Sequence, residues 1–240
     1  EVGLSFERPA AGPGAGWYRG DLQSHTHHSD AKGSLLDLRQ AARERSLDFL
    51  AVTDHNTVSH HRHLPELSAP DLLLVPGMEL TSYFGHANVW GAVGAVDFRL
   101  GSDADVAVAV ATVHRCGGLF SVNHPKYTPG CIGCDWTFAV PEGADSLEAW
   151  QGPWLQRNWE SLARYDDVLR TGRRLTLVGG SDRHQPGWPD PDPVEVQLGS
   201  PTTWLWLDEL SVAGVLGAIR SGRGFVSASP QGPFIELTVD

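Results

Sequence analysis

Histidine and carboxylate side chains occur in five short groups along the chain, and each group could supply metal ligands. The first group is the segment GDLQSHTHHSD at residues 20–30. The others are Thr53-Asp54-His55-Asn56, Glu79 with His86, Asn123-His124-Pro125 and Ser181-Asp182-Arg183-His184. Imidazole nitrogens and carboxylate oxygens are the ligands that borderline divalent metals prefer. One His beside an Asp is usually an ordinary hydrogen-bonded pair, whereas five such groups indicate a shared metal site.

Each group lies at or just after the end of a short apolar run, and such runs are typical of strands covered on both faces. Strands are expected near residues 18–24, 49–52, 72–75, 87–93, 119–122, 146–150, 175–178, 203–207, 225–227 and 234–239. Helices are expected after Ser34, after Ser102, at about 156–170 and at 211–221. This alternation predicts a mainly parallel α/β fold, in which side chains that follow the strands converge at one edge of the sheet.

The composition is that of a globular protein. Of the 240 residues 41% are apolar and nine are Trp, which is enough for a sizeable core in one or two domains. The 29 acidic against 18 basic residues argue against a nucleic-acid surface, and no apolar run is long enough to predict a transmembrane helix. Three cysteines are too few for a disulfide framework, so we expect a reducing, cytoplasmic location.

The first 16 residues and the cysteine pair stand apart from this pattern. Residues 1–16 are rich in Pro, Gly and Ala, so we expect a linker or irregular lead-in before one domain at 17–240. The only Met is Met78, so we expect the native N-terminus to be missing; a signal peptide or an upstream domain could have been cut away, and the sequence does not distinguish them. Cys131 and Cys134 have CxxC spacing, for which a coincidence in a loop competes with a redox or metal role.

Taken together, the groups resemble the motifs of the PHP (polymerase and histidinol phosphatase) family of metal-dependent hydrolases, most closely its CehA/McbA-like branch. Besides the five groups, the matching stretches include Pro76-Gly77-x-Glu79, Gly85-His86-Ala87-Asn88 and Leu147-Glu148-Ala149-Trp150. The resemblance extends from about Trp17 to Gly232. It implies a distorted TIM-like barrel of seven β/α units, with two or three metals at the C-terminal face of the strands.

The resemblance also implies which residues bind the metals. The first implied set is His25, Glu79 and Asp182, with Gln23 as a weak fourth ligand. The second is His86 and His124 together with Glu79, which bridges the first and second metals. The third is Asp30, His55 and His184. Mixed nitrogen and oxygen ligands of this kind suit Zn, Mn or Fe. Asp54 is expected to fix the orientation of an imidazole.

The first ligand position depends on how the histidines are aligned with Asp30. The family pattern is His-x-His, with its second His five residues before the Asp, and this places His25 second and Gln23 first. The alternative pair is His25 and His27, in which the second His lies only three residues before Asp30. The first alignment also matches Asp21-Leu22 and Thr26, and we prefer it. His27 or His28 could still assist the site, whereas His60, His61 and His63 are expected on a solvated loop.

The resemblance implies hydrolysis by a water that the metals activate. Glu79, Asp182 and His184 are the expected catalytic residues, and His184 could protonate the leaving group. Lys126 and Arg183 are candidates for binding an anionic part of the substrate. The expected substrate is a small phosphate ester, with no nucleic-acid or membrane partner.

Three functions remain open at this point. The first is a phosphoesterase that cleaves a phosphomonoester or a phosphodiester. The second is a hydrolase of carbamates, amides or carboxylic esters on the same metals, and the third is a non-catalytic metal-dependent binding domain. The third is disfavoured because Gln23 is the one ligand position that departs from the family pattern.

Overall fold

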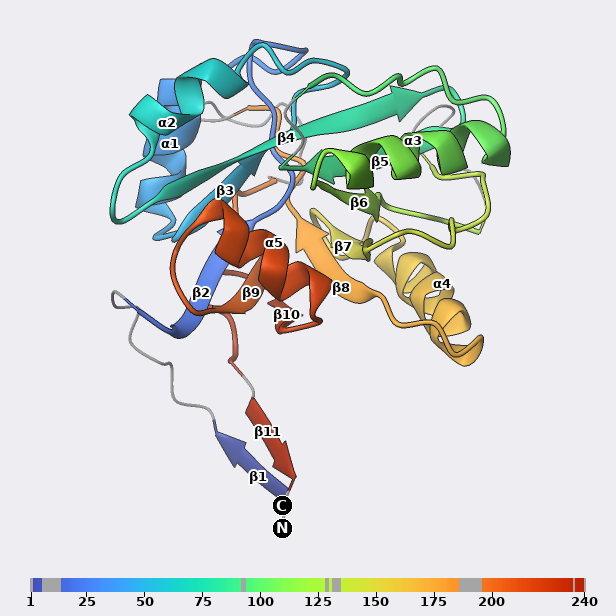
Figure 1. The fold of residues 1–240 in the computed structure, drawn as a ribbon. Coiled ribbons are helices and arrows are strands. Elements are labelled where there is room, and N and C mark those ends of the chain that lie inside the picture. The colour runs from blue at the N-terminus through green and yellow to red at the C-terminus, as the bar shows by residue number, and fades with distance from the viewer. Residues whose placement is uncertain are drawn as a thin grey trace.

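A nine-stranded sheet that curls into a nearly closed barrel forms the body of the molecule (Figure 1). The computed structural model describes residues 2–5, 14–91, 94–127, 130, 135–185, 196–234 and 236–239. In spatial order the strands are β10 (Gly224–Ser227), β9 (Thr202–Leu207), β2 (Gly16–Asp21), β3 (Phe49–Val52), β4 (Leu73–Ser82), β5 (Gly85–Trp90), β6 (Leu119–Val122), β7 (Ser146–Gln151) and β8 (Thr176–Gly180). The expected distorted α/β barrel is therefore confirmed.

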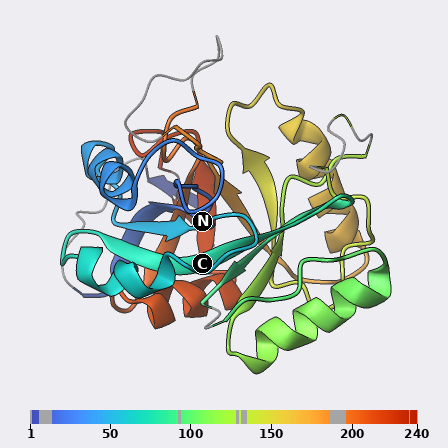
Figure 2. The ribbon, with the colours of Figure 1, turned by 90° about the horizontal axis from the view of Figure 1, so that it is seen from above.

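Helices lie around the outside of the barrel (Figure 2). They are α1 (Leu35–Glu44), the short η1 (His61–His63) and α2 (Leu64–Leu67), α3 (Asp103–Arg115), α4 (Asn158–Arg170) and α5 (Val212–Arg220). Ser34, Ser102 and Ser211 cap α1, α3 and α5 by accepting a hydrogen bond from a backbone N–H three residues further on. Arg157, before α4, has a left-handed backbone (φ 55°) and provides no side-chain cap.

The strands are apolar on both faces because each face meets a different part of the core. On β3, Leu50 and Val52 belong to the group of buried side chains that includes Leu38 of α1. Phe49 and Ala51 alternate with them, point to the opposite face of the strand and belong to a second group of buried side chains. This arrangement explains why the sequence shows continuous apolar runs rather than alternating ones.

Strand directions are more mixed than the sequence predicted. The ladders β2–β3–β4 and β6–β7–β8 are parallel, but β5 is antiparallel to both β4 and β6, and β9 is antiparallel to β2 and β10. Only Tyr83 and Phe84 join β4 to β5, and so short a connection forces an antiparallel hairpin. As a result, β5 begins at the edge of the sheet where β4 ends. Glu79 lies within β4 rather than beyond it, and His86 is the second residue of β5.

The barrel closes where β8 meets β9 and where the segment after β8 meets the segment after β2. The Thr203 hydroxyl donates to the Gly179 carbonyl (2.7 Å) and accepts from the Gly179 N–H (2.9 Å), so a side chain bridges β8 and β9. Just beyond the ends of β2 and β8, the His25 N–H donates to the Arg183 carbonyl and the Asp182 N–H donates to the Gln23 carbonyl, both at 3.0 Å. These contacts bring the first and last predicted ligand groups side by side.

Part of the expected irregular lead-in is ordered as a strand. β1 (Val2–Ser5) pairs antiparallel with β11 (Glu236–Val239) in a separate two-stranded sheet that projects from the barrel (Figure 1). In the described part of the chain no helix is both long and apolar enough to cross a membrane. Cys116 is exposed at the end of α3, whereas Cys131 and Cys134 lie outside the described residues.

Candidate metal centre

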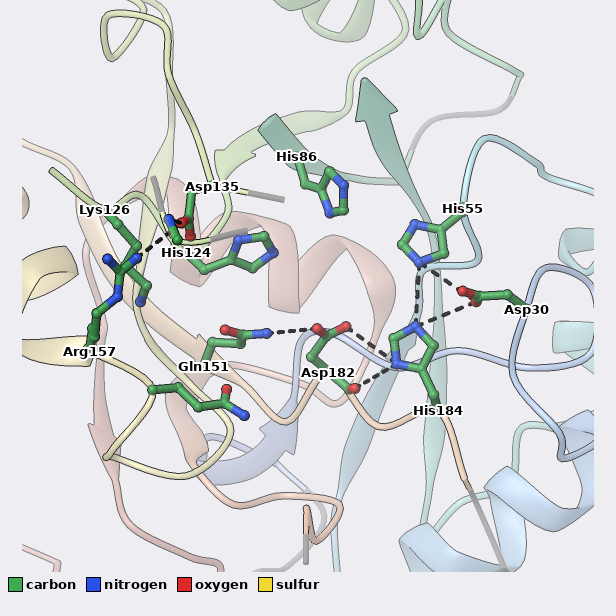
Figure 3. Close-up of a pocket in the computed structure, with 12 residues that line it drawn as sticks. Asp30, His55, His86, His124, Lys126, Asp135, Gln151, Arg157, Asp182 and His184 are labelled. Carbon is green, nitrogen blue, oxygen red and sulfur yellow. Dashed lines mark hydrogen bonds and ion pairs between the residues drawn. The ribbon is translucent and has the colours of Figure 1, made fainter. Parts of the chain in front are cut away.

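Predicted ligands from all five sequence groups converge at the edge of the sheet where the parallel strands end (Figure 3). Glu79 is placed by β4 and His86 by β5, while His55, His124 and Asp182 follow β3, β6 and β8. Gln23, His25 and Glu79 are completely buried, and His124 is 3% exposed. The ligand set that the sequence resemblance implied is thus brought together in space; that these residues bind metal remains a prediction.

The Glu79 carboxylate is the centre of the group, because four imidazoles surround it. Its Oε2 lies 3.2 Å from His25 Nε2 and 3.2 Å from His55 Nδ1. Its Oε1 lies 3.1 Å from His86 Nδ1 and 3.5 Å from His124 Nε2. Burial acts to raise the pKa of Glu79, but His86, His124 and His25 together hold that pKa well below its usual range. The carboxylate is therefore kept ionised despite its complete burial.

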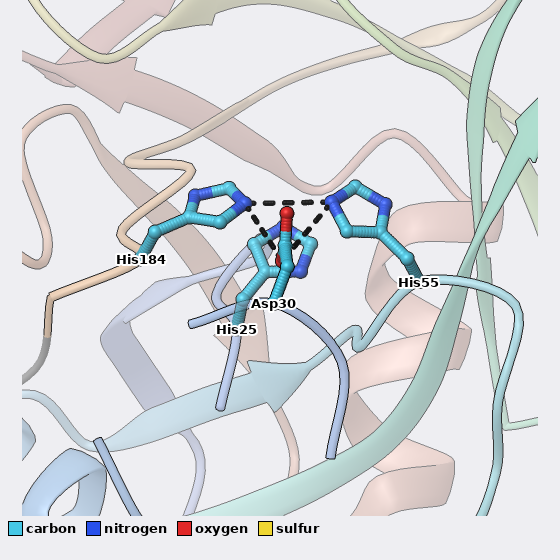
Figure 4. A group of neighbouring side chains, drawn as sticks. All are labelled: His25, Asp30, His55 and His184. Carbon is cyan, nitrogen blue, oxygen red and sulfur yellow. Dashed lines mark hydrogen bonds and ion pairs between the residues drawn. The ribbon is translucent and has the colours of Figure 1, made fainter. Parts of the chain in front are cut away.

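Potential ligand atoms form three overlapping groups, each with atoms within 4.8 Å of one another. The groups are His25, Glu79 and Asp182; His55, Glu79 and His86; and His25, Asp30, His55 and His184, the last shown in Figure 4. The first matches the implied set. In the second, His55 takes the place that was expected for His124. In the third, His25 joins the expected residues, so His25 and His55 each belong to two groups.

The donor atoms fit a divalent cation. Glu79 Oε2 and Gln23 Oε1 are buried and, among the described residues, make no hydrogen bond. An unsatisfied buried oxygen costs roughly 1–3 kcal/mol, more when it is charged, so such atoms need an explanation. A cation held by Glu79, His25 and His55 would supply a partner for these atoms.

Carboxylates also control the charge of the deepest imidazole. Burial acts to lower the pKa of His25, but Asp182, 2.9 Å from its Nε2, and Glu79 outweigh this and raise the pKa to about 10. Burial acts to raise the pKa of Asp182, and the bond to His25 reverses this, so that pKa is lowered. Each group thus stabilises the charged form of the other.

Two predicted ligands have a left-handed backbone that non-glycine residues rarely adopt: His124 (φ 27°) and Asp182 (φ 56°). Buried carboxylates support both positions. Glu148 Oε2, on β7, accepts the N–H of His124 at 3.0 Å. Asp21 Oδ1, at the end of β2, accepts the N–H of Ser181, next to Asp182, at 2.9 Å.

Asp21 joins three separate segments behind the centre. It is completely buried, which raises its pKa, and it also accepts the N–H groups of Gln23 (3.1 Å) and Gly199 (2.8 Å). Asp21→Asn would place an amide NH₂ against at least one of these donors. We expect a loss of about 1–3 kcal/mol, and hence a fall in Tm of roughly 2–4 °C per kcal/mol.

Calorimetry of metal-loaded protein would test this expectation, with Asp208→Asn as the control. Asp208 is an exposed aspartate whose Oδ1 lies 3.5 Å from Arg223 Nη1. An Asp21→Asn protein as stable as Asp208→Asn would mean that the three bonds to Asp21 contribute little.

Asp54 holds the loop that carries His25 and Asp30, rather than a ligand imidazole. Its oxygens accept the N–H (2.7 Å) and hydroxyl (2.8 Å) of Thr26 and the hydroxyl of Ser29 (2.8 Å). His60 Nδ1 lies 3.1 Å from its Oδ2. His60 is completely buried, with Nε2 3.1 Å from the carbonyls of Val52 and Gly77, so a solvated position for it was wrong. The burial of His60 could not be predicted from the polar sequence of its loop, because it depends on contacts with distant strands.

The structure places Gln23 inside the centre and His27 outside it. Gln23 Nε2 donates to Glu79 Oε1 (2.9 Å) and to Asp182 Oδ1 (3.1 Å). His27 Nδ1 instead lies 3.3 Å from the Gly33 carbonyl, and its ring stacks on His28. This placement favours the alignment that gives Gln23 the first ligand position.

We expect Gln23→His to raise metal affinity, because an imidazole would replace the amide that lies beside Glu79 and Asp182. His27→Ala should leave metal content unchanged. Equilibrium dialysis with Zn or Mn on both variants would measure this. Loss of metal from His27→Ala, with no effect of Gln23→His, would support the alternative alignment.

A cavity of about 560 Å³ opens beside the predicted ligands, within the usual size for a small-molecule site. Part of its wall consists of predicted ligands: Asp30, His55, His86, His124, Asp182 and His184. The rest consists of Gly130 and five polar or charged residues, of which only Lys126 was expected: Lys126, Asp135, Gln151, Gln156 and Arg157.

The two predicted anion-binding residues have different surroundings. Lys126 lines the cavity, and its burial lowers its pKa to about 8. Arg183 is not among the described residues that line the cavity; it is 6% exposed, and its Nη1 donates to the Val196 carbonyl. Its placement therefore does not support a role for Arg183 in binding substrate, because its guanidinium holds a neighbouring loop.

Some lining residues follow the strand-end rule and others carry no sequence signal. Gln151 ends β7, at the same edge as the ligands, and donates to Asp182 Oδ2 at 2.7 Å. Its position after an apolar run could have identified it. Asp135 and Arg157 lie in connecting segments with no recurring pattern, and their pairing at 3.0 Å becomes visible only in the fold.

No protein-family model matches the chain, and no curated protein matches it by sequence. Solved structures do match. One is a two-domain protein from Bacteroides vulgatus containing a predicted PHP-like metal-dependent phosphoesterase, with 20% identity, TM-score 0.65, and 93% of this chain and 68% of that one covered. PsfC from Pseudomonas syringae has 15% identity and TM-score 0.57, with 93% and 92% covered.

A third structure, an amidohydrolase from Chromobacterium violaceum with bound sulfate, has 16% identity and TM-score 0.51, with 72% of this chain and 92% of that one covered. At these identities the likeness establishes the fold, which is a PHP-type barrel.

Proposed function

We propose that the protein is a metal-dependent hydrolase, and specifically a phosphoesterase that acts on a small molecule. The observation that carries this proposal is the ionised Glu79 carboxylate, buried among the ring nitrogens of four histidines, of which His55, His86 and His124 line the cavity. Such a set can hold two cations that share one carboxylate. The membership of the sequence in the CehA/McbA-like branch is part of this proposal.

His25, His55, His86, His124, Asp30, Asp182 and His184 would hold two or three divalent ions of Zn, Mn or Fe, with Glu79 as the bridge and Gln23 nearby. When bound, such ions activate a water and neutralise charge on a phosphoryl group. In the described part of the cavity wall no Ser or Cys offers a nucleophile, which favours attack by water.

The chain itself would orient the reacting groups. His184 Nδ1 donates to the Asp182 carbonyl at 2.8 Å, which fixes its tautomer and turns Nε2 towards Asp30 Oδ1, 3.4 Å away. With Nδ1 protonated in this way, Nε2 is the nitrogen that would hold an ion, and a water in the cavity would supply the proton that the leaving group requires. Gln151, bonded to Asp182 Oδ2, holds that carboxylate towards the same space.

The second candidate, hydrolysis of a carbamate, amide or carboxylic ester, would use the same residues. It is favoured by the solved neighbour named an amidohydrolase, which has a fold similar to that of this chain.

One experiment separates the candidates: chromogenic phosphomonoesters, phosphodiesters, carboxylic esters and anilides are assayed with Mn, Zn and Fe. We expect the highest kcat/KM on a phosphate ester. Turnover of carboxylic esters or anilides alone would support the second candidate, and turnover of none would support a binding domain.

A further inference from the structure

Lys126 is a buried ammonium group with no carboxylate bonded to it. The residue is 3% exposed, and its Nζ donates to Ser161 Oγ at 2.7 Å and Asn158 Oδ1 at 3.4 Å. In the described part of the chain no carboxylate oxygen lies within 4 Å of this nitrogen. A lysine ammonium has three N–H donors, and the two neutral partners account for two of them. A buried cation that carboxylates such as Glu148 and Asp135 stabilise only from a distance is costly, so its position in a cavity wall suggests a ligand.

The position of Lys126 is fixed at one end of the cavity. Asn158 and Ser161 both belong to α4, so a swing of the ammonium towards the predicted metals would break both hydrogen bonds. Figure 3 shows Lys126 beside Arg157 and Asp135, with Asp30 and His55 on the opposite side. The predicted ligand His124 lies between the two sides in this view, so a group bound to Lys126 would lie apart from one held by Asp30 and His55.

The neighbouring cation is already paired. Arg157 Nη2 lies 3.0 Å from Asp135 Oδ2, and the Gly130 N–H also donates to Asp135. A Cβ on Gly130 would come within 3.2 Å of the Arg157 guanidinium, so the backbone packs directly on that group. Arg157 is thus held by two carboxylates, Asp135 and, at 3.6 Å, Glu160, whereas Lys126 has no carboxylate among the described residues in contact with its ammonium.

We propose that the Lys126 end of the cavity binds a second anionic group of the substrate, a carboxylate or a phosphate, remote from the bond that is cleaved. The inference rests on the proposed function for the identity of the first group. The expected substrate is therefore a small phosphate ester that carries a second anionic group. The 560 Å³ cavity has room for such a molecule.

Matched phosphonates, which cannot be hydrolysed, test the proposal on the metal-loaded full chain. Calorimetry would compare alkylphosphonates of two to five carbons with the same compounds ending in a carboxylate, and with the corresponding bisphosphonates. We expect the best dianionic compound to bind about tenfold tighter (about 1.4 kcal/mol) than its alkyl counterpart. The carboxylate and bisphosphonate arms show which second anion is preferred.

Lys126→Met should reduce this preference to about onefold, because it removes the ammonium that would bind the second anion. Lys32→Met is the matched control, since Lys32 is the chain's other lysine and is exposed; it should keep the tenfold preference. Should Lys126→Met fail to fold, Lys126→Gln removes the charge while retaining a polar group near Ser161 and Asn158.

Two results would overturn the proposal. One is a wild-type protein that binds no dianionic compound more tightly than its alkyl counterpart. The other is a preference that survives the loss of Lys126, as expected if Lys126 only balances the charge of the buried Glu148. The ester assays are independent of this test. A Lys126-dependent preference without turnover of any ester would contradict the proposed function and leave the anion site standing.

Discussion

Glu79→Gln is expected to cause the largest loss of activity of any single isosteric change in this protein. The substitution keeps the shape of the side chain but removes the negative charge that faces His25, His55, His86 and His124. Removing one partner of a buried charge pair costs roughly 3–5 kcal/mol. That cost falls on folding stability; separately, loss of the shared ligand should lower kcat/KM by about 10³-fold, which corresponds to about 4 kcal/mol in the activation barrier.

Steady-state kinetics at saturating metal and metal analysis of the same samples would measure this effect. His114→Ala is the control, because His114 is exposed on α3, where its Nε2 pairs with Asp145 Oδ2 at 2.9 Å, remote from the cavity wall. Comparable losses in Glu79→Gln and His114→Ala would show that Glu79 is not the shared ligand.

The second large effect is expected on removal of metal. A chelator should abolish hydrolysis and lower Tm, because the ligand atoms that fit a cation would lose their partner. Ligand present at 100 times its Kd stabilises a protein by about 2.7 kcal/mol. For a chain of this size, at roughly 2–4 °C per kcal/mol, Tm should fall by about 5–11 °C.

Differential scanning calorimetry with and without chelator would give this shift, and re-addition of Mn, Zn or Fe should reverse it. The Glu79→Gln protein should show a much smaller shift, since it binds less metal to begin with. A wild-type Tm that is insensitive to the chelator, with activity retained, would be incompatible with a catalytic metal.

Local sequence patterns were sufficient for much of the fold and the site. His55, His124 and Asp182 each follow an apolar run, and parallel strands bring such positions to one edge. Ser34 and Ser102 correctly marked the starts of two helices. The spacing of apolar residues and the identity of helix-capping residues depend only on neighbouring positions, so both can be recognised in the sequence alone.

Properties that depend on distant segments could not be predicted in this way. The hairpin of β4 and β5 puts Glu79 inside a strand, although Pro76 and Gly77 suggested that the strand ended earlier. His60 is buried because the carbonyls of Val52 and Gly77 meet over it. Arg183 was expected at the site because it follows a strand, yet Arg157, which has no such sequence signal, is the arginine among the described residues that line the cavity.

The most direct test of the central claim is the metal content of the purified protein. The chain would be reconstituted with Mn, Zn or Fe, desalted and measured by elemental mass spectrometry alongside Glu79→Gln. We expect two or three equivalents of divalent metal per chain, as for a shared-ligand site, and a clear reduction in the variant. Less than about one equivalent in the wild-type protein, or equal content in both, would contradict the assignment of Glu79 and its surrounding histidines as a metal centre.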